Sequence, residues 1–358
     1  MADLRLRRAV RFGAPSLVLA GLAAVVAAGP TGPIAGSPSG APPVRSPAVS
    51  ATARPSAVAS ATPTAEPRRT IVIQAVGDVS LDPRYLPILI ERGWRWPWAG
   101  LGGIFRRDDL SIVNLECPAT TVVEPIAKTF NFRCDPLALP AMRAAGIEVA
   151  NQANNHSFDQ QTAGLLDSLV QLRAAGLATV GAGRTLDEAM APAIVEVGGW
   201  RIAVVGIGQV LDPPWMIATD DRPGTTNGHD TAQVLAAIGR AAEVADLVVV
   251  TIHWGIELDT APRAYQVALA EQMVAAGADI VFGHHAHRLQ PLGSVGGRPV
   301  FYGLGNFVWP RLSTAGATTG IARVLVHPDG TFEAELVPAT IVEDGRPVLD
   351  RPPAGGVW

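Results

Sequence analysis

Histidine is clustered in this sequence in a pattern typical of metal sites. The chain has 7 histidines in 358 residues, and three of them, His284, His285 and His287, directly follow one apolar run. Two more, His156 and His253, also follow apolar runs and stand near amide or carboxylate side chains. One histidine after a strand is usually structural, but five in such positions, beside oxygen donors, are typical transition-metal ligands.

Five short apolar runs each end in side chains that can bind a metal. Between these runs lie amphipathic stretches at 160–175, 229–244 and 262–276, whose spacing predicts helices. Strands that alternate with helices form an α/β sheet covered on both faces, and their carboxyl ends meet at its ligand-binding edge. We therefore expect the five ends to converge on one site. They are Asp78, Glu116, Asn155 with His156, His253, and the cluster of His284, His285 and His287.

The chemistry of these donors predicts the cofactor. Burying several ionisable groups together is unfavourable unless something compensates their charge. A mixture of carboxylate, amide and imidazole suits Mn, Fe or Zn better than Mg or Ca. The donors exceed one tetrahedral shell and favour two ions about 3.5–4 Å apart that share a bridging carboxylate. The sequence thus predicts one or two divalent transition-metal ions.

The N-terminal part carries a targeting pattern. Arginines between positions 5 and 11 precede an uncharged apolar stretch at 14–28. This stretch is shorter than the roughly 20 residues of a spanning helix, so a cleaved signal peptide and an uncleaved membrane anchor over 1–29 both stay open. The pair Arg7 and Arg8 also permits twin-arginine export. We expect an exported, extracytoplasmic protein, membrane-anchored or secreted, whose N-terminal segment contacts a membrane if it is retained.

Composition divides the remaining chain into three parts. Residues 30–69 are mainly Pro, Ala, Ser, Thr and Gly, which predicts a disordered tether. Apolar runs and amphipathic stretches over 70–340 predict one folded domain, and 341–358 is expected to be a tail. Glycine-rich and Asp-Gly turns in the C-terminal part predict β-hairpins, from which we expect a second, antiparallel sheet packed on the first.

Charge and cysteine content narrow the partners and the covalent structure. The net charge is −4 and no basic run interrupts the folded region, so no nucleic-acid partner is expected. In an exported protein, the two cysteines Cys117 and Cys134 are more often a disulfide than two separate buried thiols. The chain has no Cys-x-x-Cys pair, and a zinc site built on cysteines is not expected.

Seven motifs between about residues 71 and 309 occur in the order of a known family. They read AVGDVSLD, SIVNLECPAT, KTFNFRCDP, ANNHSFD, IHWGIEL, GADIVFGHHAHRLQP and FYGLGNFVW. The series resembles the CapA family of poly-γ-glutamate capsule biosynthesis proteins, a branch of the calcineurin-like metallophosphoesterase superfamily. The resemblance implies an α/β fold, namely a calcineurin-like metallophosphoesterase sandwich of two mixed β-sheets flanked by helices.

The resemblance also implies a role for each strand-end residue. Asp78 would bind a first metal, Glu116 would bridge two metals, and His156 would donate a proton to the leaving group. In extended chain, residues two apart point to the same side, which favours His285 and His287 as ligands and turns His284 away. The remaining ligands would therefore be Asn155, His253, His285 and His287.

Two departures from the phosphoesterase pattern concern metal binding. The Asp-x-His motif is here Asp78-Val79-Ser80, so one imidazole is absent, and the longer Glu116 replaces an aspartate. Both changes favour weaker binding or a single ion.

Other polar residues in the matching segments have two interpretations each. Asp159 either orients His156 or simply begins the next helix. Lys128, the one lysine of the chain, and Arg133 would bind an anionic substrate or form a solvated surface pair. Glu257 would support a metal ligand or cap the following helix.

Two functional hypotheses follow. In the first, the protein is a metal-dependent hydrolase in which metals polarise a phosphoryl or acyl group and His156 protonates the leaving group. The resemblance implies a substrate related to the γ-glutamyl polymer or to a phosphorylated precursor. In the second, the domain is a non-catalytic accessory protein that binds nascent anionic polymer or membrane synthase subunits for export and anchoring. His156 beside Asp159 favours the first hypothesis, and Ser80 favours the second.

Overall fold

The computed structural model describes residues 66–210 and 214–351. The predicted signal peptide or anchor at 1–29 and most of the predicted tether at 30–69 lie outside these ranges. Among the described residues, no helix combines the length and the apolar character needed to cross a membrane.

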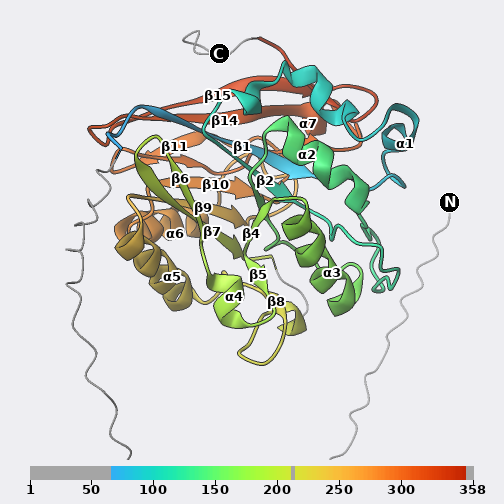
Figure 1. The fold of residues 1–358 in the computed structure, drawn as a ribbon, viewed down its shortest axis with the longest axis horizontal. Helices are drawn as coiled ribbons and strands as arrows, with labels where there is room; N and C mark the ends of the chain where they lie inside the picture. The colour runs from blue at the N-terminus through green and yellow to red at the C-terminus, as the bar shows by residue number, and fades with distance from the viewer. Residues whose placement is uncertain (1–65, 211–213, 352–358) are drawn as a thin grey trace, which may run out of the picture. The chain divides into compact units, whose positions relative to one another are not determined.

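The first sheet is mixed and has 8 strands (Figure 1). β1 pairs in parallel with β2, and the parallel series continues through β3 to β4. On the other side of β1, the strands β14, β15 and β16 pair antiparallel, while β13 pairs in parallel with its end. The strands are β1 (Ile71–Val79), β2 (Leu110–Leu115), β3 (Val149–Asn151), β4 (Ala178–Val180), β13 (Asn306–Val308), β14 (Thr318–Val326), β15 (Phe332–Ile341) and β16 (Pro347–Leu349).

The second sheet has 6 strands in the order β11-β12-β10-β9-β7-β6. Its central strands β12, β10, β9 and β7 are parallel, and an antiparallel strand closes each edge. The strands are β6 (Ala193–Val197), β7 (Trp200–Gly208), β9 (Leu247–His253), β10 (Ile280–His284), β11 (Leu292–Val295) and β12 (Arg298–Phe301), and a separate small sheet pairs β5 (Ala182–Gly183) with β8 (Gly224–Thr225).

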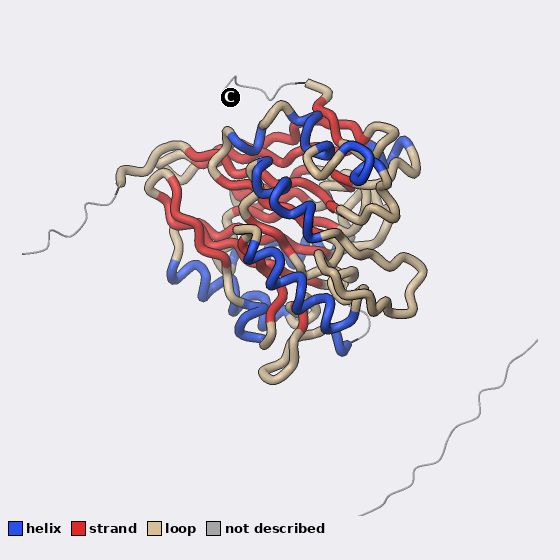
Figure 2. The backbone as a smooth tube through the Cα atoms, turned by 45° about the vertical axis from the view of Figure 1, so that its right-hand side comes forward, coloured by secondary structure: helices blue, strands red, loops and turns tan. Residues whose placement is uncertain are grey.

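Apolar side chains from both sheets form one buried layer between them. It joins Ile73 of β1 and Val324 of β14 to Val249 of β9 and Ile280 of β10. Helices α2 and α3 pack on the outer face of the first sheet, and α5 and α6 pack on the outer face of the second (Figures 1 and 2). This arrangement confirms the predicted sandwich of two mixed sheets flanked by helices. The helices are α2 (Leu139–Ala145), α3 (Gln161–Ala174), α5 (Thr231–Val244) and α6 (Ala264–Ala275).

Helix α5 illustrates how the sequence specifies these covering helices. Asp230 caps its first turn, because the carboxylate accepts a hydrogen bond from the amide of Gln233. Val234, Ile238 and Ala241 recur at helical spacing and are buried against the second sheet. The helices predicted at 160–175, 229–244 and 262–276 are confirmed as α3, α5 and α6. The shorter helical elements are α1 (Ile88–Arg92), α4 (Leu186–Met190), α7 (Thr314–Ala317), η1 (Trp96–Leu101), η2 (Ile104–Arg106), η3 (Pro136–Ala138) and η4 (Pro214–Met216).

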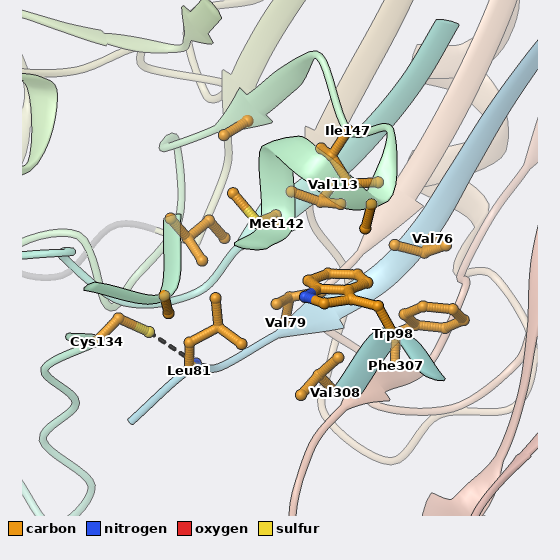
Figure 3. Packing of buried hydrophobic residues seen from close by; sticks show 14 of the residues in the cluster. Val76, Val79, Leu81, Trp98, Val113, Cys134, Met142, Ile147, Phe307 and Val308 are labelled. Atoms are coloured by element: carbon orange, nitrogen blue, oxygen red, sulfur yellow. Dashed lines mark hydrogen bonds between the residues drawn. The ribbon is translucent and has the colours of Figure 1, made fainter. Parts of the chain in front are cut away.

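The outer face of the first sheet carries its own core, shown in Figure 3. Val79 of β1 and Val113 of β2 pack there with Met142 of α2 and with Trp98 of η1. Phe307 of β13 joins the same cluster. A continuous apolar layer therefore packs on the outer face of the strands that carry the polar site.

Two predictions about the C-terminal part are wrong. The antiparallel strands do not form a sheet of their own: β14 to β16 extend the first sheet, and β11 and β12 extend the second. The physical reason is that β14 is buried along nearly its whole length, so it needs strand partners on both edges. The folded domain also continues beyond residue 340, because β15 reaches Ile341 and β16 pairs with it. The hairpins β11–β12 and β14–β15 are confirmed.

Candidate metal centre

The strand ends of both sheets carry the polar residues of the centre. In the first sheet, Asp78 of β1 pairs in register with Asn114 of β2 and with Asn306 of β13. In the second sheet, His253 at the end of β9 pairs with His284 at the end of β10. The carboxyl ends of parallel strands thus supply the site, as an α/β sheet predicts.

An irregularity near the end of β1 positions Asp78. The register of β1 against β2 shifts between Val76 and Asp78, at Gly77. A side chain at Gly77 would overlap the backbone carbonyl of Gly305, so this close approach requires glycine. The amide of Asp78 donates a hydrogen bond of 2.9 Å to that carbonyl. Gly77 therefore permits the close backbone packing, and Asp78 supplies a carboxylate of the site.

Five of the six predicted ligands form two groups that share one carboxylate. Ligand atoms of Glu116, His253 and His285 lie within 4.8 Å of one another, and so do those of Asp78, Glu116 and His287. Glu116 belongs to both groups and is buried. This is the position expected for a carboxylate that bridges two ions.

Asn155, the sixth predicted ligand, adjoins the first of these groups. Its Oδ1 lies 2.8 Å from Nε2 of His253, and the same nitrogen lies 3.4 Å from Oε1 of Glu116. In the second group, Nδ1 of His287 lies 3.1 Å from Oδ2 of Asp78. The fold therefore brings all six residues together, although they come from distant parts of the sequence.

Several of these metal-binding atoms make no hydrogen bond with the described residues. Both carboxylate oxygens of Glu116 and Nδ1 of His285 are buried and make no hydrogen bond within the described residues. Burying such atoms unpaired is unfavourable, and a bound cation would offset that cost. The mixed oxygen and nitrogen donors fit divalent transition-metal ions.

The imidazoles of the first group are in the form that binds metals. Burial lowers the pKa of His253 well below its usual value, and burial with the charge of His287 lowers the pKa of His285 to about 4. Both rings are therefore neutral at pH 7. Burial and the charge of Asp78 raise the pKa of Glu116 well above its usual value.

His287 differs because two carboxylates face it. Burial opposes its positive charge, but the charges of Glu116 and Asp78, with a hydrogen bond to Asp78, raise the pKa of His287 to about 10. Burial also disfavours the charge of Asp78, yet its contacts with His287 hold the pKa of Asp78 below its usual value. Without metal, His287 carries a proton that a metal ligand would have to lose.

His284 stays outside both groups, but not for the predicted reason. Its Nε2 lies 3.0 Å from Oγ1 of Thr251 within the second sheet, and its Nδ1 lies 3.7 Å from Oδ1 of Asp78. His285 and His287 have φ values of 84° and 50°, in the left-handed region. The chain is not extended there, so the argument from alternating side chains is wrong even though its choice of residues matches the groups.

Two asparagines that had no predicted role orient the ligands. Nδ2 of Asn114 donates a 2.8 Å hydrogen bond to Oδ1 of Asp78 and lies 3.2 Å from Nδ1 of His253. Oδ1 of Asn306 lies 2.7 Å from Nδ1 of His287. Such contacts fix the rotamer and tautomer of a ligand. The sequence carried this signal only for Asn114, which stands near the carboxyl end of β2, whereas Asn306 begins β13.

His156 lies beside the metal-binding groups without belonging to either. Its Nδ1 lies 2.6 Å from Oδ2 of Asp159, and both side chains are buried. The ring of Phe132 packs on the imidazole at 4.3 Å between centroids, and the Phe132 amide donates a 2.6 Å hydrogen bond to Asp159. Helix α3 begins only at Gln161, so Asp159 orients His156 rather than starting the helix.

Lys128 belongs to this same cluster. Its Nζ donates a 2.8 Å hydrogen bond to the carbonyl of Asn155 and lies 3.1 Å both from Oδ1 of Asp159 and from Nδ1 of His156. The interpretation of Lys128 as part of a solvated surface pair is therefore wrong. Arg133 donates its backbone amide to Asp82 at 2.7 Å, and its guanidinium makes no hydrogen bond or ion pair with any described residue.

Glu257 and Ser80 affect how many side chains of the centre can bind a metal. Glu257 does not cap α6, which begins at Ala264 after Arg263. The Oγ atom of Ser80, where the phosphoesterase pattern has an imidazole, is buried and makes no hydrogen bond within residues 66–210 and 214–351. The second metal-binding group thus contains only one imidazole.

The predicted disulfide between Cys117 and Cys134 is confirmed, with the Cα atoms 5.7 Å apart. Both residues are buried in the core on the outer face of the first sheet. The amide of Leu81 approaches Sγ of Cys134 at 2.8 Å, as Figure 3 shows. Because Cys117 directly follows Glu116, the bridge restrains the backbone next to the shared carboxylate.

Comparison with known proteins identifies the family of this chain. A family model described as "Bacterial capsule synthesis protein PGA_cap" matches residues 72–311. The capsule biosynthesis protein CapA of Bacillus anthracis is 30% identical over 285 residues, which cover 77% of this chain and 69% of that protein. A probable polyglutamine synthesis accessory protein of Mycobacterium tuberculosis is 33% identical over 256 residues, 67% of either chain.

Among solved structures, the NAD nucleotidase of Haemophilus influenzae aligns with a TM-score of 0.47 and 13% identity, covering 79% of this chain and 60% of that one. The extent of the family match and the identity to CapA decide the family. The chain belongs to the CapA family of bacterial capsule synthesis proteins.

Proposed function

We propose that this protein is a metal-dependent hydrolase. The observation that supports this most is the buried pair of His156 and Asp159 beside two donor groups that share Glu116. A purely structural domain would have no need for an oriented imidazole next to a cluster of unpaired ligand atoms. The reaction class is cleavage of a phosphoester or a γ-glutamyl bond.

The residues would divide the work as follows. Divalent ions held at the two groups would supply positive charge that polarises the scissile bond and acidifies water. Nδ1–H of His156 donates a hydrogen bond to Asp159, so Nε2 of the protonated ring is the atom that would pass a proton to the leaving group. Asn114 and Asn306 would keep the ligands Asp78 and His287 in place.

The substrate proposed is an anionic polymer or its phosphorylated precursor, handled outside the cytoplasm. The positive charge of Lys128 beside His156 supports a negatively charged substrate, and the guanidinium of Arg133, which has no partner among the described residues, would be a further contact. The relative in Bacillus anthracis is named for capsule biosynthesis, and membrane synthase subunits would be the protein partners. The N-terminal segment would contact the membrane or be removed on export.

A second candidate function is a non-catalytic accessory role. Ser80 removes an imidazole from the second group, and one relative is named as an accessory protein. In that case the domain would bind nascent polymer or synthase subunits without cleaving anything.

The test is to purify the full-length chain without chelators, measure its metal content and screen phosphoester and γ-glutamyl substrates. A hydrolase should hold at least one equivalent of Mn, Fe or Zn and turn over one of these substrates, and Asp78→Asn should lose both properties. Asp187→Asn, an exposed aspartate in α4, is the matched control. Metal binding without turnover on either class, combined with polymer binding, would select the accessory role.

A further inference from the structure

A third group of metal-binding side chains lies next to the two already described. It consists of Glu257, His285 and His287, whose ligand atoms lie within 4.8 Å of one another. Glu257 is exposed, whereas His285 is buried and His287 partly buried. The carboxylate therefore approaches the histidine pair from the solvent side.

The loop that carries Glu257 is tied directly to the histidine loop. The amide of Leu258 donates a 2.8 Å hydrogen bond to the carbonyl of Ala286, which lies between the two histidines. Leu258 has a φ of 66°, so it shares the left-handed backbone of His285 and His287. The only other such non-glycine residue in the described chain is Gln161.

Backbone of this kind is unfavourable for non-glycine residues and persists only where the surroundings impose it. Here three such residues occur in two loops that are hydrogen-bonded to each other. The strain is therefore concentrated at the segment that places the carboxylate of Glu257 against two imidazoles. Packing alone would not require this, because Glu257 and Leu258 are both exposed.

The charge of Glu257 has no competing partner. Within residues 66–210 and 214–351, its carboxylate makes no hydrogen bond and no ion pair with arginine or lysine. At the same time the second metal-binding group is short of donors, because Ser80 stands where the phosphoesterase pattern has histidine. A free carboxylate thus lies beside a site that lacks a ligand.

We propose that Glu257 is an additional metal ligand of this centre, reaching it from the solvent side next to His285 and His287 and offsetting the imidazole that Ser80 cannot supply. The inference rests on the metal centre of the proposed function. A third carboxylate raises the share of oxygen among the ligand atoms. A site richer in oxygen favours Mn²⁺ or Fe²⁺ over Zn²⁺.

The first experiment measures Mn²⁺ affinity on the full chain. The protein is stripped with chelator and titrated with Mn²⁺, with free ion followed by electron paramagnetic resonance. Glu257→Gln should weaken the binding of one equivalent of Mn²⁺ by roughly 10- to 100-fold. This is the range seen when groups that support a metal site are removed. Glu243→Gln, an exposed glutamate in α5, is the matched control and should leave the affinity unchanged.

The second experiment separates direct ligation from an effect of charge at a distance. Glu257→Cys places a soft thiolate at the position, so Cd²⁺ should bind with a thiolate charge-transfer absorption that Glu243→Cys does not show. Wild-type Mn²⁺ affinity in Glu257→Gln, or no such absorption in Glu257→Cys, would overturn the inference and leave the proposed function intact. If wild type binds no Mn²⁺, Fe²⁺ or Zn²⁺ at all, the proposed function and this inference both fail.

Discussion

The carboxylate of Asp159 holds the imidazole of His156, with 2.6 Å between Oδ2 and Nδ1, while its other oxygen lies 3.1 Å from Nζ of Lys128. One buried carboxylate thus joins a candidate proton donor to the single lysine of the chain. The roles of His156 and Lys128, which share this carboxylate, can be tested by separate substitutions. His156 would transfer a proton, whereas Lys128 would act through its charge.

His156→Ala should keep the metal content of wild type, because His156 belongs to none of the three metal-binding groups. If the protein is a hydrolase, the loss of a general acid should lower turnover by about 10²- to 10⁴-fold. Metal analysis and initial rates on the same preparation measure both effects, with Asp78→Asn as the variant that loses metal. Turnover equal to wild type in metal-loaded His156→Ala would exclude the acid role.

Lys128→Met should raise the pKa of His156. Burial lowers that pKa below its usual value, Asp159 opposes the lowering, and the positive charge of Lys128 adds to it. Histidine NMR titration of the metal-free protein measures the shift. Arg133→Met is the control, because its guanidinium makes no hydrogen bond with any described residue, and it should leave this titration unchanged.

A different outcome would indicate that Lys128 contacts the substrate. If the titration of His156 is the same in Lys128→Met and wild type while KM for an anionic substrate rises, the lysine binds substrate. If the titration shifts and KM does not change, its effect is on the His156–Asp159 pair.

Metal binding should release protons and strengthen as pH rises. In the metal-free protein, the charges of Glu116 and Asp78 overcome burial and raise the pKa of His287 to about 10, so the ring is protonated at pH 7. A ligand nitrogen must lose that proton, and the apparent affinity should rise by about tenfold per pH unit for each proton displaced.

Calorimetry in two buffers with different ionisation enthalpies counts the protons released. His287→Gln should release about one proton fewer per metal bound. Binding with no proton release between pH 6 and pH 8 would contradict the protonated state of His287.

Removing the disulfide should weaken both the fold and the centre. Cys117 and Cys134 are 17 residues apart, and closing a loop of this size contributes about 3 kcal/mol to the free energy of unfolding in the chain-entropy model. The double variant Cys117→Ser, Cys134→Ser should lose about that much in urea denaturation, and its metal affinity should fall because Glu116 precedes Cys117. Two free thiols titrated in unreduced, unfolded protein would show that the bridge is absent in solution.

The sequence by itself determined the features that depend on neighbours along the chain. Apolar runs and helical spacing were enough to predict α3, α5 and α6, and the polar ends of the runs were enough to predict that these side chains converge on one site. The choice of six ligands among them came from the resemblance to the CapA family. These predictions succeed because strand and helix periodicity, and the carboxyl-edge rule for parallel strands, are local properties.

The tertiary structure alone decided what depends on long-range packing. β14 joins the first sheet beside β1 because its buried length needs partners on both edges, and no local pattern states which strand provides them. The contact of Lys128 with Asp159 spans 31 residues, and that of Asn306 with His287 spans 19. The left-handed backbone at His285, His287 and Leu258 arises where two loops are held against each other, and it is this arrangement that brings Glu257 to the centre.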